Sequence, residues 1–134
     1  MKSATHRFAR NLIGALALAG TAALVPAAAL ADAPQEINTA VAHANLAAQA
    51  GNLDTVHMHL HHVLNCLVGP GGNGFDAGPG NPCANAGKGA IPDTADAAAK
   101  QKLETAATRA RAGIADSDTA AAKQAATDLV AMLK

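Results

Sequence analysis

The chain has 134 residues, of which half are hydrophobic, and its ten basic residues balance its ten acidic residues. This length is enough for one small domain. With two Phe, no Trp, no Tyr and no basic excess, the composition gives nucleic-acid binding no support.

Residues 1–31 have the features of a cleavable signal peptide. Positive charges near the start lie at Lys2, Arg7 and Arg10, and an uncharged apolar run follows from residue 12 to 25. The run is shorter than the roughly 20 residues that span a bilayer as a helix. Because Ala29-Leu30-Ala31 fits a cleavage site, we expect a mature chain from Asp32 that is periplasmic or secreted and has no membrane attachment after cleavage.

Charge is unevenly distributed along residues 32–134. Removing the three basic residues of the leader leaves seven Lys and Arg against ten Asp and Glu, and none of the seven lies before Lys88. All the histidines of the expected mature chain lie in this cation-free half, at His43, His57, His59, His61 and His62. No basic side chain nearby in the sequence would therefore repel a metal ion bound there.

A first helical hairpin is predicted over residues 36–68. Apolar residues recur with helical period at Ile37, Val41, Ala44 and Ala48, and Gly51 can end this helix. Asn52 or Asp54 can cap a second helix. Its large apolar residues fall on one arc and it ends at Val68 before a Gly-Pro-Gly-Gly run.

A Gly/Pro-rich loop is predicted over residues 69–92, which hold eight of the twelve glycines and four of the six prolines. Such long loops are usually functional or disordered, so this one is a possible docking segment for a protein partner. In an exported chain Cys66 and Cys83 are expected to form a disulfide, which would tether the loop and stabilise the fold by about 3 kcal/mol. The alternative interpretation is that both cysteines are thiolate ligands of a soft metal.

A second helical hairpin is predicted over residues 93–133. Asp93 or Thr94 begins a third helix that ends near Ala112, before Gly113, and Asp116 or Asp118 caps a fourth. Short turns within each hairpin predict an all-α, antiparallel, up-down-up-down four-helix bundle. Its alanine-rich core would bury little area, so a disulfide, a metal ion or homo-oligomerisation is expected to add stability.

The chemical signal of the chain is the run His57-Met58-His59-Leu60-His61-His62. His57 and His61 are four residues apart on one helix face, and reflection about the turn near Asn52 places His43 opposite His61. We predict a site of His43, His57 and His61, completed by His62, Met58 or water, with His59 on the opposite flank. Imidazole suits copper, nickel and zinc, and a thioether adds a preference for copper.

Other interpretations of these residues require no metal. His57 and His61 can be residues at the edge of a core, His59 and His62 solvated polar residues, and Met58 a packing residue. The chain lacks the H-E-x-x-H motif of zinc hydrolases and the C-x-x-C-H motif of covalent haem attachment. No nucleophile and base pair is recognisable, so we expect no enzymatic activity.

The segment from Val41 to Leu67 contains Ala42-His43-Ala44, a Gly-Asn-x-Asp turn and then repeated histidines. It resembles the small periplasmic metal-binding proteins, which are histidine-rich four-helix bundles. The resemblance implies transition-metal binding, copper above all, with all five of these histidines as possible ligands. Residues 93–134 lack histidine, and the loop and both cysteines are additional, which favours one or two ions over high-capacity storage.

The sequence thus predicts an exported metal-binding bundle that acts as a chaperone, buffer or sensor. One alternative is non-covalent haem binding between helices, although few aromatic residues are present to pack a porphyrin. Another alternative is an exported interaction module that docks a partner through residues 69–92 and whose histidines are incidental.

Overall fold

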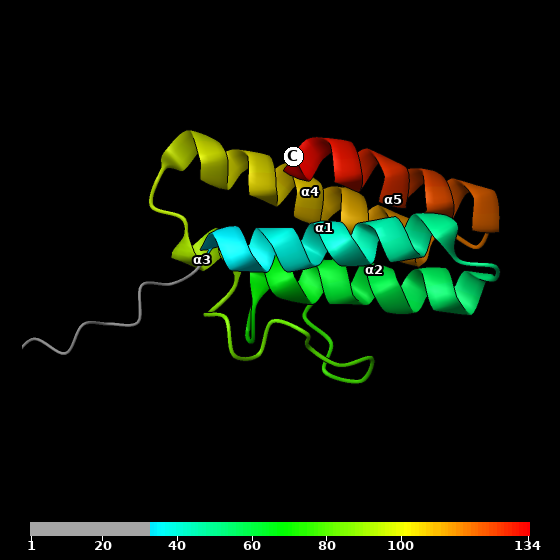
Figure 1. Cartoon of the computed structure of the whole chain (residues 1–134), viewed down its shortest axis with the longest axis horizontal. Helices are drawn as coiled ribbons and strands as arrows, with labels where there is room; N and C mark the ends of the chain where they lie inside the picture. The colour runs from blue at the N-terminus through cyan, green and yellow to red at the C-terminus, as the bar shows by residue number, and fades with distance from the viewer. Residues whose placement is uncertain (1–32) are drawn as a thin grey trace, which may run out of the picture.

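The computed structural model describes residues 33–134, and this part of the chain is all-helical with no strand. Its helices are α1 (Ala33–Gln49), α2 (Leu53–Val68), the short α3 (Ala90–Asp93), α4 (Ala97–Ala115) and α5 (Thr119–Leu133). The four long helices lie side by side (Figure 1). The predicted signal peptide lies outside the described residues. No helix of the described part has the length and apolar character needed to cross a membrane.

Helix α2 supplies most of the large core side chains, and its neighbours contribute mainly alanine. The fully buried apolar residues of α2 include Val56, Leu60, Val63, Leu64 and Leu67. Buried alanines on α1, α4 and α5 surround them, at Ala40, Ala44, Ala47, Ala106, Ala107, Ala110, Ala122, Ala125 and Ala126. The small side chains let three helices approach α2 closely, so the interior is filled without many large residues.

The buried face of α1 agrees in part with the predicted one. Helical periodicity predicts Ile37, Val41, Ala44 and Ala48, whereas the structure buries Glu36, Ala40, Ala44 and Ala47. Glu36 is fully buried, and its Oε1 accepts a hydrogen bond of 2.8 Å from the backbone N–H of Gly89. Ile37 and Ala48 are partly buried and pack against the core, whereas the fully buried positions are held by small residues and Glu36.

Capping residues explain where the helices begin. Asn52 caps α2 by accepting a hydrogen bond from the Thr55 N–H, and Asp118 caps α5 through the Ala121 N–H. Each was one of the two residues predicted for that cap. The predicted start of the third long helix, at Asp93 or Thr94, is a few residues too early, because α4 begins at Ala97. Asp96 caps α4 through the Ala99 N–H, because the chain first forms the short helix α3.

The sequence predicted that the third helix ends before Gly113. In the structure α4 continues to Ala115. Gly113 is buried where α4 meets two other helices. A Cβ atom at this position would lie 2.6 Å from Ala125 Cβ and 2.9 Å from Leu60 Cδ1. Glycine at 113 therefore allows close helix packing.

The segment between α2 and α3 lies beside α2 (Figure 1). The predicted disulfide Cys66–Cys83 is present. Asn65, also fully buried, donates to the carbonyl oxygens of Asp76 at 2.6 Å and Gly80 at 2.7 Å, and accepts from the Asp76 N–H at 3.0 Å. This segment is thus held by consecutive residues of α2 and forms part of the packed structure.

Candidate metal centre

Three imidazoles from two helices converge on the outer side of the α1 and α2 pair. Nδ1 of His43, on α1, lies 3.1 Å from Nδ1 of His59 and 3.2 Å from Nδ1 of His62, both on α2. The candidate ligand atoms all lie within 4.8 Å of one another, and the three residues are partly buried. Because metal to nitrogen bonds measure roughly 2.0–2.1 Å for zinc, nitrogen atoms this close can share one ion.

The helix geometry brings these residues together. His59 and His62 are three residues apart on α2, so they lie on the same face one turn apart. Helix α1 packs against this helix and presents His43 between them, with ring centroids 5.3 Å from His59 and 4.6 Å from His62. The cluster thus depends on the docking of α1 on α2.

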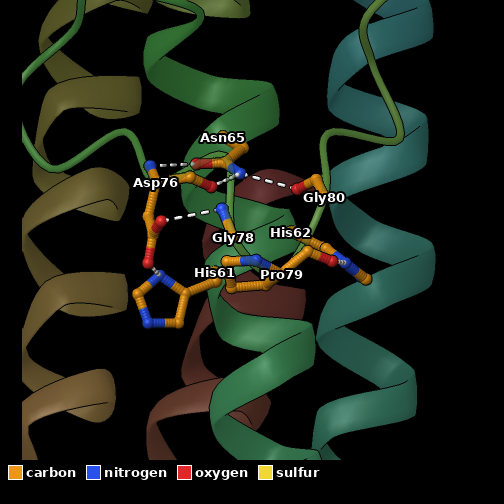
Figure 2. A network of polar contacts seen from close by, with 7 residues as sticks. All are labelled: His61, His62, Asn65, Asp76, Gly78, Pro79 and Gly80. Carbon is orange, nitrogen blue, oxygen red and sulfur yellow. Dashed lines mark hydrogen bonds and ion pairs between the residues drawn. The ribbon is translucent and has the colours of Figure 1, made fainter.

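The other ring nitrogen of His62 determines which tautomer faces the cluster. Nε2 of His62 lies 2.7 Å from the backbone carbonyl oxygen of Pro79 (Figure 2). A carbonyl oxygen only accepts, so Nε2 carries the proton and donates it. In neutral His62 the Nδ1 atom is then unprotonated, and its lone pair is directed at His43.

Hydrogen bonds between the rings do not satisfy all three of the Nδ1 atoms that face one another. His43 Nδ1 can donate a proton to His62 Nδ1, but it contacts His59 Nδ1 at almost the same distance. One N–H cannot align well with two acceptors. A single cation that accepts all three lone pairs would satisfy every nitrogen at once.

The electrostatics of the cluster favour neutral rings. The pKa of His43 is lowered to about 4, first by burial and then by the like charges of the neighbouring His62 and His59. Burial and then His62 also lower the pKa of His59. Neutral imidazole is the form that binds metal, so protons compete weakly at these two residues at neutral pH.

The predicted set of His43, His57 and His61 is not the one that the structure brings together. His57 Nε2 donates to the carbonyl oxygen of Asp116 at 2.9 Å, which directs this ring toward the turn between α4 and α5. His61 faces the loop instead, with Nδ1 4.0 Å from Asp76 Oδ2 (Figure 2). His59, assigned to the opposite flank in the prediction, belongs to the cluster.

The remaining candidate ligands do not join this group. Met58 is exposed on α2, with 39% of its surface accessible, and no described contact links it to the three imidazoles. Cys66 and Cys83 are bonded to each other, which removes the alternative of thiolate ligands in this oxidised state. Among the described residues, the convergent donor set therefore consists of imidazole nitrogen alone.

Two residues that support the site were missed in the sequence. Asn65 is a buried polar residue in an apolar helix segment, and that departure from the apolar pattern was the available signal. Pro79 contributes only its carbonyl oxygen, so its side chain gives no indication of the role.

No family model matches this chain, and neither a curated protein nor a solved structure does.

Proposed function

We propose that this protein binds one divalent transition-metal ion through Nδ1 of His43, His59 and His62, and acts as an exported chaperone, buffer or sensor for that ion. The observation that carries the proposal is the convergence of the three Nδ1 atoms, two pairs of them 3.1–3.2 Å apart. The hydrogen bond from His62 Nε2 to Pro79 supports it. A ligand histidine in a metalloprotein generally donates its other ring N–H in this way.

The chemistry of the donors favours copper, and nickel and zinc ions should bind to the same site more weakly. Three imidazole nitrogens suit all three ions, and affinities of nitrogen sites generally rise from nickel to Cu(II) and fall again at zinc. Three protein ligands leave a position for water or for a donor from an acceptor molecule. Such a site suits reversible binding better than permanent structural metal, and this favours a role in carrying or buffering the ion.

The arrangement of the four long helices and the export of the protein belong to this proposal. We infer that the four long helices form an antiparallel, up-down-up-down bundle, which the short turns before α2 and before α5 and the pairing of α1 with α2 and α5 support. The predicted signal peptide and the disulfide support an exported protein in an oxidising compartment.

Titration of purified, tag-free protein with Cu(II), Ni(II) and Zn(II) in competition with a chelator tests the proposal. We expect one tight site, with Cu(II) bound most strongly. His43→Ala, His59→Ala and His62→Ala should each weaken binding by more than the roughly 10–100-fold that loss of an outer-shell partner typically causes.

His57→Ala and His61→Ala are the matched controls, because they remove histidines of the same helix that face Asp116 and Asp76 instead of the cluster. Both variants should keep the affinity of the original protein. Binding that is lost in the controls and kept in the three cluster variants would contradict the assignment, and absence of any tight site would refute the function.

A further inference from the structure

The loop between α2 and α3 is hydrogen-bonded to the histidine cluster through His62. His62 contacts both the cluster and the loop, because its Nδ1 faces His43 at 3.2 Å and its Nε2 contacts the Pro79 carbonyl at 2.7 Å. The ring thus lies between the candidate ion and the loop backbone. Any shift of the Pro79 carbonyl changes the partner available to Nε2.

Asn65 fixes the position of that carbonyl. It lies one helical turn after His62 on α2, and its side chain bonds to the loop on both sides of Pro79, at Asp76 and at Gly80 (Figure 2). The side-chain amide is fully buried, so these bonds are not exchanged readily for water. Asn65 therefore holds the peptide segment whose oxygen accepts from His62.

Gly80 contributes from the loop side. Its φ angle of 102° lies in the region that favours glycine, and the peptide bond that precedes it carries the Pro79 carbonyl. A side chain at residue 80 would strain this conformation, and the peptide would rotate to relieve it. The direction of the Pro79 oxygen thus depends on Gly80 as well as on Asn65.

We propose that Asn65 is a positioning residue of the metal centre, which acts through the Pro79 carbonyl to keep His62 in the tautomer that presents an unprotonated Nδ1. This inference rests on the proposed function for its metal-binding consequence. Without the carbonyl acceptor, neutral His62 exchanges between its two tautomers, and the form with a proton on Nδ1 cannot bind the ion. The loop is then part of the centre and sets its affinity.

The test measures the His62 tautomer directly, by ¹⁵N NMR of the imidazole nitrogens in the metal-free protein at mildly alkaline pH. In the original protein we expect the proton on Nε2 of His62. Asn65→Ala should populate the tautomer with the proton on Nδ1, and Gly80→Ala should do the same by an independent route. Copper affinity should fall in both variants by at least about tenfold, as for other outer-shell partners.

Asn52→Ala is the matched control for lost stability. It removes the N-cap of α2, a side-chain bond to the Thr55 N–H at 2.9 Å, and leaves the loop network intact. This variant should unfold at a lower denaturant concentration than the original protein. It should nevertheless keep the His62 tautomer and the copper affinity of the original protein.

The outcomes separate this inference from the metal-binding function. A His62 tautomer that stays unchanged in both Asn65→Ala and Gly80→Ala overturns the positioning role, even where affinity falls. Should Asn65→Ala fail to fold, Gly80→Ala decides the question. If the original protein binds no metal but its His62 tautomer shifts in the variants, the positioning role stands and the proposed function fails.

Discussion

Nε2 of His62 donates a hydrogen bond of 2.7 Å to the backbone carbonyl oxygen of Pro79, seventeen residues away in the chain. Through this contact a ring of the candidate metal centre is joined to the disulfide-tethered loop. The centre therefore combines one residue of α1, two residues of α2 and the backbone of a surface segment. Its properties should respond to changes in each of these parts.

Metal should stabilise the folded protein, because the converging nitrogens exist only when α1 is docked on α2. At a free metal concentration 100 times the dissociation constant, the gain is about 2.7 kcal/mol. Chemical denaturation with and without Cu(II) measures it. His59→Ala should abolish the gain and His61→Ala should retain it, whereas equal stabilisation of both variants would show that the ion binds elsewhere.

The metal-free protein should lose stability as the pH falls from 7 to 5. The pKa of His43 is lowered to about 4, first by burial and then by His62 and His59, against 6.5 for the unperturbed ring. The unfolded chain therefore takes up a proton in this range and the folded chain does not. Stability therefore rises with pH between these two values. Denaturation midpoints at several pH values measure the slope.

His43→Ala should make this slope shallower, because the proton uptake of the unfolded chain at residue 43 is gone. Thr39→Ala, one turn earlier on the same helix, is the control. It removes only a bond from the hydroxyl to the carbonyl oxygen of Gln35 and should leave the slope unchanged. Equal slopes in the two variants would mean that His43 does not carry the pH dependence.

Gly113→Ala should destabilise the protein by about 1–3 kcal/mol through overpacking. Alanine is favoured over glycine in a helix by about 1 kcal/mol, but the added Cβ would lie only 2.6 Å from Ala125 Cβ, so the steric cost is larger. Gly51→Ala is the control, since a Cβ there has no neighbour within 4 Å. A stabilised Gly113→Ala variant would show that α4 can move away from α5 at little cost.

Replacing both cysteines, in Cys66→Ser/Cys83→Ser, should lower the free energy of unfolding by about 3 kcal/mol, because the disulfide restricts the unfolded chain. Denaturant titration measures this loss. A reducing agent should produce a similar loss in the original protein and none in the double variant. If the reducing agent leaves the free energy of unfolding of the original protein unchanged, the disulfide has no stabilising role.

Several features followed from the sequence because they depend on local chemistry. Polar caps such as Asn52 and Asp118 satisfy the first backbone N–H groups of a helix, and the apolar arc of α2 has to be buried whatever it packs against. The bond between Cys66 and Cys83 followed from the presence of two cysteines in a chain with a predicted signal peptide. The sequence also identified His43 and the histidine run of α2 as the source of any metal ligands.

Only the tertiary structure decided which histidines meet. Helical period fixes the direction of a side chain about its own axis, but the cluster depends on how α1 is rotated against α2. In the observed rotation Glu36 and small alanines are fully buried and Ile37 is partly buried against the core, and His43 meets His59 and His62. His57 and His61 instead contact Asp116 and Asp76, which are distant in the chain, so no local pattern could assign them.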